Sequence, residues 1–389
     1  MGPEVRMSRY LDAIHQYRRG RLSCVEAAEV LGISERHFRR LRDTYEAEGA
    51  EGLIDRRRGR KSGRRAGTDK IEFVVEQYRT RYFDFTVKHF HEALRDEFPS
   101  FNLSYTWTKT VLHTHGLVKP APRRSAHRKK RPRRPLPGMM LHQDGSRHRW
   151  IPAIDAEWDL IVTMDDATSQ IYSAFLVEEE GTMSSFHALR EVVARHGLFC
   201  SLYTDRGAHY FHTPKAGEPV DKAVLSQVGR ALEQLGIEHI AAYSPEARGR
   251  SERAFGTLQD RLPKELALAG ITTLAEANRF IAETYLPDHN ARFAVQPEQP
   301  GSAFVADTGG AWRDILCIQE DRQVGNDNTV RYHGLTLQLP PVPWRHHFAK
   351  TKVRVHHYPD GELAIFHGPR RLACFASDGT PITQSKQAA

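Results

Sequence analysis

Hydrophobic residues recur at helical spacing through the first 118 residues of the chain. Apolar side chains three and four positions apart predict amphipathic helices, and the expected ranges are 10–17, 23–31, 34–42, 70–82, 89–98 and 105–115. Two groups of three helices are therefore predicted, at 1–54 and at 70–118.

From Met139 the pattern changes to short apolar runs that alternate with helical stretches. The runs predict strands over 140–144, 160–164, 171–177, 200–204 and 237–241, and helices over 182–196 and 224–235. Three strands followed by alternating helices and strands is the order of a ribonuclease-H-like α/β domain, expected over 138–300. Beyond Ser302 only strand patterns follow, and they predict a small SH3-like β-barrel over 301–380, with strands at 330–332, 335–339, 353–358, 363–366 and 372–375.

The first helical group has the spacing of a helix-turn-helix. Ser23 and Glu26 have capping-box spacing, Gly32 supplies a turn, and Ser34 begins the next helix. The run 27–34, Ala-Ala-x-x-Leu-Gly-Ile-Ser, is similar to the helix-turn-helix of many bacterial DNA-binding proteins. An ordinary small helical bundle is the alternative. The side chains expected in a DNA major groove are Arg36, His37, Arg39 and Arg40.

The second helical group predicts another helix-turn-helix module, of the winged kind, over 70–118. Its last helix would be the recognition helix, with Lys109 near its start. A helical bundle used only for dimerisation fits the pattern nearly as well. Two tandem modules would allow one chain to read a DNA site longer than one helical turn.

The positive charge of two basic connectors exceeds the net charge of the whole chain, which is +8. Residues 55–65 contain seven Lys or Arg against one Asp, and 119–135 contain nine against none, which leaves −7 for the rest. Such runs beside helical modules predict contact with a polyanion, with solvated linkers as the alternative. The prolines of the second connector favour an extended arm laid along phosphates or a minor groove. In the two linkers, 55–69 and 119–137, the expected DNA contacts are Arg56, Arg57, Arg58, Arg60, Arg123, Arg124, Arg128, Lys129, Lys130, Arg131, Arg133 and Arg134.

Composition argues against several other classes of protein. No window approaches 18 consecutive apolar residues, so no membrane span is expected. The N-terminus lacks the apolar core of a signal peptide, which favours a cytoplasmic protein. The four cysteines are scattered without paired spacing, so neither a disulfide framework nor a zinc site is predicted.

Three carboxylates are the candidates for chemistry. Asp144 and Asp205 each end a strand-like run, and Glu252 follows Ser244-Pro245, which predicts a helix start. A surface ion pair is the alternative for Glu252. Its cationic neighbours, also predicted to contact DNA, are Arg248, Arg250 and Arg253. Two further acids, Asp165 and Asp166, occupy a predicted strand-to-strand turn, where Asp is favoured for local hydrogen bonding, and are not expected to be ligands.

The three acidic motifs resemble those of the retroviral-integrase catalytic core, which many bacterial insertion-sequence transposases share. The motifs are Leu141-His142-Gln143-Asp144-Gly145-Ser146, Tyr203-Thr204-Asp205-Arg206-Gly207 and Ser244-Pro245-x-x-x-Gly249-x-x-Glu252. The runs 252–262 and 287–294 are similar to transposases of the ISNCY type in particular. The resemblance implies a DDE enzyme in which Asp144, Asp205 and Glu252 are both the catalytic and the metal-binding residues. It also implies a cofactor of two Mg²⁺ ions, with Mn²⁺ as a substitute.

The function implied by the resemblance is that of a DNA transposase. It would bind the terminal inverted repeats of its element, cleave the ends to expose 3′-hydroxyls, and join them to target DNA. Joining two ends implies a homo-oligomer, at least a dimer, associated with the nucleoid. A DNA-binding regulator with an inactive core is the alternative, and a nuclease without joining activity is a third reading. Two departures are a longer Asp205-to-Glu252 interval, with an insertion near 212–221, and Gln259 where many relatives have a basic residue.

Overall fold

The computed structural model describes residues 3–54, 66–120, 132–212, 224–243, 245–306 and 309–382. They belong to two compact units, Met1–Glu76 and Gln77–Ala389. Among the described residues, no helix is both long and apolar enough to cross a membrane.

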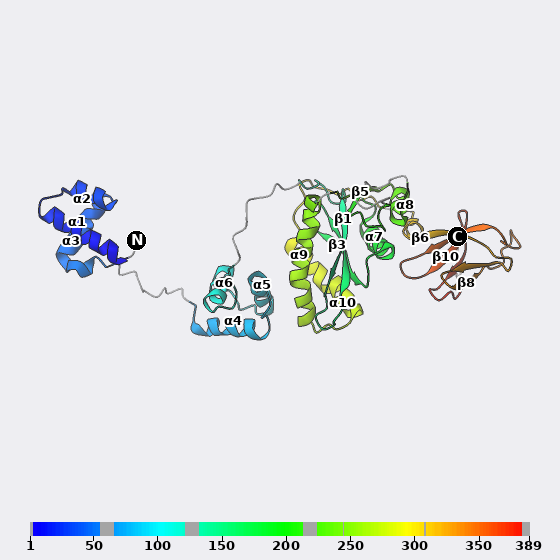
Figure 1. Cartoon of the computed structure of the whole chain (residues 1–389), viewed down its shortest axis with the longest axis horizontal. Helices are drawn as coiled ribbons and strands as arrows, with labels where there is room; N and C mark the ends of the chain where they lie inside the picture. Colours follow the sequence, from blue (N-terminus) through cyan, green and yellow to red (C-terminus); the bar gives the residue numbers. More distant parts are fainter. Residues whose placement is uncertain are drawn as a thin grey trace. The chain divides into compact units, whose positions relative to one another are not determined.

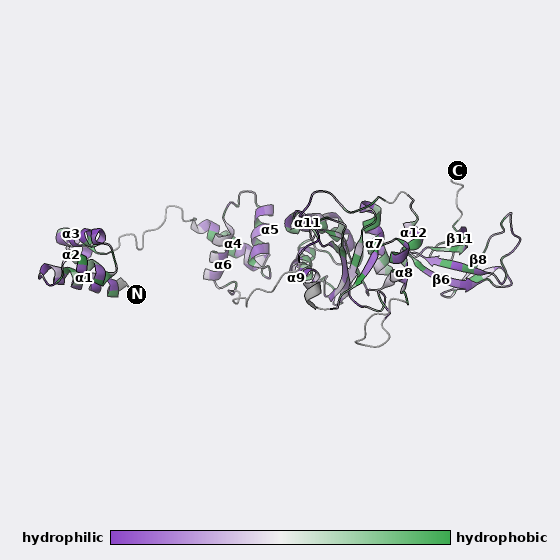
Figure 2. Cartoon of the chain, turned by 90° about the horizontal axis from the view of Figure 1, so that it is seen from above, coloured by the Kyte–Doolittle hydropathy of each residue, from purple (hydrophilic) through white to green (hydrophobic). Residues whose placement is uncertain are grey.

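The first unit contains the predicted helix-turn-helix. Its helices are α1 (Pro3–Arg18), α2 (Cys24–Leu31) and α3 (Glu35–Gly52). The capping box at the start of α2 is present, and Gly32 ends that helix in the left-handed region, with φ of 69°. Each helix combines apolar and polar residues along its length (Figure 2), and the apolar ones form a core of Ala13, Ile14, Ala27, Ala28 and Phe38.

The second helical group consists of α4 (Thr68–Thr80), α5 (Val87–Glu97) and α6 (Tyr105–Thr114). Ser104 caps α6 by accepting a hydrogen bond from the backbone N–H of Trp107, 3.3 Å away. Residues 66–120 form helices and no strand, so the wing expected of this module is not found there.

A five-stranded mixed sheet forms the centre of the second unit. Its order is β3-β2-β1-β4-β5, and the strands are β1 (Leu141–His148), β2 (Trp158–Asp165), β3 (Ile171–Val177), β4 (Ser201–Thr204) and β5 (Glu238–Ala241). β1, β2 and β3 pair antiparallel, whereas β4 runs parallel to both β1 and β5. The succession along the chain, three antiparallel strands and then strands alternating with helices, is the one that the sequence predicts for the core.

Helices cover both faces of this sheet (Figure 1). On one face α7 (Thr182–His196) and α8 (Gln227–Gln234) pack against Leu141 and Leu202. On the other face lie α9 (Pro245–Leu268), α10 (Leu274–Phe280), the π-helical turn Ile281–Tyr285 and α11 (Leu286–Phe293). Leu258 and Leu262 of α9 are buried there with Leu160 and Val162 of β2. Successive side chains of each strand therefore serve two different cores.

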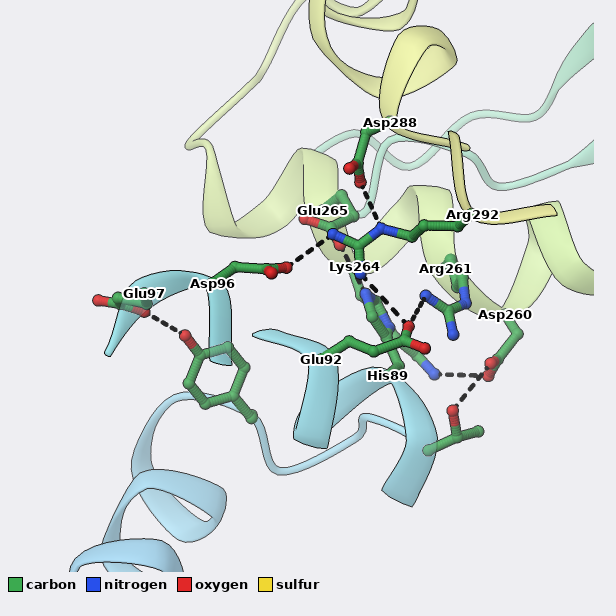
Figure 3. Close-up of polar contacts among 12 residues, drawn as sticks. His89, Glu92, Asp96, Glu97, Asp260, Arg261, Lys264, Glu265, Asp288 and Arg292 are labelled. Carbon is green, nitrogen blue, oxygen red and sulfur yellow. Dashed lines mark hydrogen bonds and ion pairs between the residues drawn. The ribbon is translucent and has the colours of Figure 1, made fainter. Parts of the chain in front are cut away.

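Polar side chains join α5 to the outer side of α9, and we call these contacts the α5–α9 seam (Figure 3). Arg261 Nη1 lies 2.7 Å from Glu92 Oε2, and His89 Nε2 lies 2.6 Å from Glu265 Oε1. Thr86, just before α5, is hydrogen-bonded to Asp260 of α9, and beside the seam Arg292 of α11 pairs with Asp96 of α5. Ion pairs and hydrogen bonds thus attach α5 to the core helices.

The C-terminal strands do not form the predicted SH3-like barrel, and that prediction is wrong. After the short helix α12 (Trp312–Ile315), the strands are β6 (Ile318–Gln323), β7 (Thr329–Tyr332), β8 (Leu335–Gln338), β9 (Lys352–His357), β10 (Leu363–His367) and β11 (Arg370–Phe375). Four of them form an open sheet of order β11-β10-β9-β6, and β7 pairs with β8 alone. The hairpin closes the core by side-chain packing, with Val330 and Leu337 against Val355 and Ile365, and not by strand pairing.

Candidate catalytic site beside strands β1 and β4

The parallel pairing of β1 with β4 brings two of the predicted acids to one level. His142 pairs with Tyr203, and the same register continued by two residues places Asp144 level with Asp205. Alternation of side chains along β1 puts Asp144 on the face of His142 and Tyr203, whose ring centroids lie 5.1 Å apart, and Asp205 is the first residue after β4. Asp144 is buried, with 8% of its surface exposed, and Asp205 is half-buried.

The face of β1 that presents Asp144 is the face covered by α9. Ser146, two residues further along, accepts a hydrogen bond of 3.0 Å at its Oγ from Gln259 Nε2 of α9. Gln143 lies on the opposite face and donates to the carbonyl oxygen of Ser185 in α7, at 3.3 Å. Asp144 is therefore directed toward α9 and not toward α7.

Two contacts fix how α9 runs along β1. Near the start of α9 Arg250 pairs with Asp166, which is hydrogen-bonded to His142 Nε2 at 2.7 Å. Farther along, Gln259 reaches Ser146. Between these contacts α9 rises by about 13 Å at 1.5 Å per residue, and β1 extends by about 13 Å at 3.3 Å per residue. The helix therefore runs alongside the strand in the same direction.

Glu252 lies between these two contacts, near the level of Asp144. It precedes Gln259 by about two helical turns, so the two side chains project from the same side of α9. Unlike Asp144, Glu252 is exposed. The geometry thus places the third predicted acid on the helix that flanks the other two.

The described residues do not yet gather a complete metal site. Among them, no group of three or more His, Cys, Asp or Glu side chains is close enough to hold an ion. Asp144 and Asp205 supply only carboxylate oxygens, which are the donors that Mg²⁺ prefers. The donor chemistry of the two aspartates therefore fits a hard divalent cation.

Sequence reasoning missed the side chains on the other flank of Asp144. The hydroxyl of Tyr210 lies 3.2 Å from Gln143 Oε1 and 3.4 Å from Glu180 Oε1. Burial, together with the charges of Glu180 and the two aspartates, holds the pKa of Tyr210 well above its usual range. A Cβ at Gly145 would lie 2.2 Å from Glu180 Oε2. That glycine, directly after Asp144, was the signal that another group approaches the backbone closely.

Comparisons with known proteins decide the family. A helix-turn-helix domain model matches residues 11–61. The "Putative transposase y4bF" of Sinorhizobium fredii is 31% identical over 348 residues, which cover 89% of this chain and 75% of that protein. The chain belongs to the transposases. The transposase for insertion sequence IS1202 of Streptococcus pneumoniae is 27% identical over 380 residues, covering 88% of this chain and 79% of that protein.

Solved structures similar to this transposase include integrases. The HTLV-2 integrase catalytic core domain in complex with magnesium is 20% identical with a TM-score of 0.28, covering 37% of this chain and 83% of that one. A simian T-cell lymphotropic virus intasome in complex with a PP2A regulatory subunit is 17% identical with a TM-score of 0.32, covering 68% of this chain and 85% of that one.

The two turn aspartates of the transposase have partners within the protein. Both are fully buried. Asp165 accepts hydrogen bonds from the backbone of Gly138 and from Thr168, and burial raises its pKa. Burial also acts to raise the pKa of Asp166, but hydrogen bonds from His142 and the Arg134 backbone, with nearby positive charge, hold that pKa well below its usual range. These contacts agree with the structural role predicted for the turn.

The predicted DNA-contacting residues of the transposase lie in several places. Arg36, His37, Arg39 and Arg40 are exposed on α3, and Lys109 is exposed on α6. Two others contact Asp166: the Arg133 guanidinium donates to its carbonyl oxygen at 2.9 Å, and Arg250 pairs with its carboxylate. Arg253, next to Glu252, is exposed on α9. Arg134 is exposed, and its backbone N–H donates to Asp166. Outside the described side chains lie Arg56, Arg57, Arg58, Arg60, Arg123, Arg124, Arg128, Lys129, Lys130, Arg131 and Arg248.

Proposed function

We propose that this transposase cleaves the ends of a mobile element and joins the exposed 3′-hydroxyls to target DNA. The observation that supports it is the arrangement around β1: Asp144 lies on β1, Asp205 directly follows the neighbouring parallel strand β4, and Glu252 lies on the helix alongside. In-line displacement at phosphorus needs charge stabilisation at both the attacking and the leaving oxygen.

In this proposal the three acids would hold two divalent cations. Bound Mg²⁺ or Mn²⁺ supplies Lewis acidity toward phosphate oxygens and a more acidic water. Asp144 lies within β1 and Asp205 directly follows β4, so the sheet would position this half of the site. Glu252 would complete it from α9. The protein's own part is to orient the carboxylates and to present the DNA.

DNA contact is proposed for the helix-turn-helix and for the basic connectors. The exposed cations of α3 would lie in a major groove, and the connector arginines would contact phosphates, which makes binding dependent on salt. Recognition of terminal inverted repeats and assembly of at least two protomers belong to the same proposal, because two ends have to be joined in concert.

The test replaces each acid by its amide in the full chain. Asp144→Asn, Asp205→Asn and Glu252→Gln should each abolish Mg²⁺-dependent cleavage and joining, since each loses a charged ligand, while binding of end DNA in a gel-shift assay stays nearly unchanged. Glu233→Gln, an exposed residue of α8, is the matched control and should cleave normally. An amide variant that cleaves end DNA at the wild-type rate would falsify the assignment of that residue.

A DNA-binding regulator with an inactive core remains the second candidate. It is favoured by one observation, that the described residues gather no three-ligand metal group. Purified wild-type protein that binds end DNA yet shows no metal-dependent nicking would support it. If nicking occurs but the 3′ ends never become linked to a second duplex, the chain is a nuclease without joining activity.

A further inference from the structure

One fully buried carboxylate connects three separate segments next to the candidate site. Asp166 follows β2, and its side chain has no exposed surface. It is hydrogen-bonded to His142 Nε2 of β1 at 2.7 Å, accepts from the backbone N–H of Arg134 at 2.8 Å, and pairs with Arg250 of α9. A buried charge is tolerated only when it is paired and hydrogen-bonded in this way.

The positions of its partners are informative. His142 stands two residues before Asp144 on the same face of β1, and Arg250 stands two residues before Glu252 in α9. Asp166 is therefore bonded to two residues that each stand two positions before a proposed metal ligand, one on the strand and one on the helix. Gln259 and Ser146 provide the second contact between these elements, but that contact lies beyond both acids.

The first turns of α9 depend on the Arg250 contact. Among the described side chains near its start, α9 buries Ser251 and Phe255, and most of its buried apolar residues follow from Leu258 onward. Helix ends with few buried contacts open most readily. Among the described residues, the ion pair with a carboxylate anchored beside the sheet is a polar contact that holds this end of α9 near β1.

We propose that Asp166 is a positioning residue for the catalytic acids, which holds the first turns of α9 against β1 so that Glu252 comes alongside Asp144. This inference rests on the proposed function of the three acids. Asp166 itself touches neither DNA nor the reacting atoms. It acts through Arg250 on the helix and through His142 on the strand, and it keeps the two elements in one relative position.

The primary test is Asp166→Asn in the full chain. The amide keeps the size of the side chain but removes the charge that holds Arg250. A displacement of about 1 Å at a catalytic group lowers rates by about 100-fold, so cleavage should fall about 10- to 100-fold. The Mg²⁺ concentration for half-maximal rate should rise, and affinity for end DNA should not change. Hydrogen exchange of the amides of residues 249–255 should become faster.

Two further variants separate positioning from general destabilisation. Arg250→Lys keeps a positive charge and should retain more activity and slower exchange than Arg250→Ala. It also tests the contact if Asp166→Asn fails to fold. Arg261→Ala removes an ion-paired arginine from the same helix, and it should leave the exchange of 249–255 unchanged.

Two results would overturn the inference. In the first, Asp166→Asn and Arg250→Ala cleave DNA at the wild-type rate and with the wild-type Mg²⁺ dependence, while Glu252→Gln is inactive. That result would exclude the positioning role of Asp166 and leave the proposed function intact. The other is unchanged exchange of residues 249–255 in both variants. An active Glu252→Gln overturns the proposed function, and the inference with it.

Discussion

Removing the charge of Arg261 should loosen the α5–α9 seam without unfolding the core. The perturbation is Arg261→Met, which keeps most of the length and apolar stem of the side chain. Its partner Glu92 is left with Lys88 at 3.0 Å and Arg292 at 3.4 Å. Because Lys88 is largely exposed, the two remaining cations compensate only in part.

The expected magnitude follows from the burial of the pair. Arg261 and Glu92 have 9% and 19% of their side-chain surface exposed, so the pair lies between an exposed and a buried one. Exposed pairs contribute up to about 1 kcal/mol, and breaking a buried one costs about 3–5 kcal/mol. Burial acts to raise the pKa of Glu92, but Arg261 and Lys88 lower it below its ordinary value, so the charged pair is net favourable. We expect a loss of about 2 kcal/mol, roughly a 30-fold increase in opening of the seam.

The assay is native-state hydrogen exchange in the full chain, read at the amides of α5. Arg279→Met, an exposed arginine of α10, is the matched control and should change opening by less than about 0.5 kcal/mol. In a double-mutant cycle with Glu92→Gln, the coupling energy should be about 1–3 kcal/mol. Exchange in α5 that is the same in Arg261→Met and Arg279→Met would refute the reasoning.

Two other predictions concern a glycine and three histidines. Gly145→Ala would place a Cβ 2.2 Å from Glu180 Oε2, so the carboxylate has to move; we expect a folded protein with reduced cleavage, and a wild-type rate would show that the position of Glu180 is immaterial. Burial lowers the pKa values of His239, His289 and His356 from 6.5 to about 4. As pH drops, these histidines therefore take up protons in the unfolded chain before they do so in the folded protein. The free energy of unfolding falls as pH drops from 6.5 toward 4, by about 2 kcal/mol for each histidine at pH 5. Urea midpoints at pH 7 and pH 5 check this, with a smaller difference expected in His289→Gln and equal midpoints in the wild type contradicting it.

The sequence was sufficient for much of the fold because local signals were strong. Apolar runs predicted the strands of the core sheet, and the Ser23–Glu26 spacing predicted a capping box that the structure contains. β6 was missed because Ile318 is its only apolar residue, and the strand forms through pairing with β9. The barrel was wrong because alternation predicts strands but not which strands pair to close a sheet.

The candidate site was predictable in its residues but not in its geometry. Asp144 and Asp205 could be named from the ends of apolar runs, whereas their common level depends on the register between β1 and β4, which no local pattern encodes. Asp166 was recognised as a turn residue. Its bonds to His142 and Arg250 join positions 24 and 84 residues away, and such partners follow only from the packed structure.

The length of α9 puts the attachment of α5 and the proposed ligand Glu252 on one helix, which matters for engineering. This single helix of 24 residues is about 36 Å long, with Glu252 in its early turns and Arg261 about two and a half turns later. A library of variants that changes the attachment of α5 would also change the tilt of α9. The specificity for DNA ends and the cleavage rate would then change together. Each round of a selection for new end sequences therefore has to measure both.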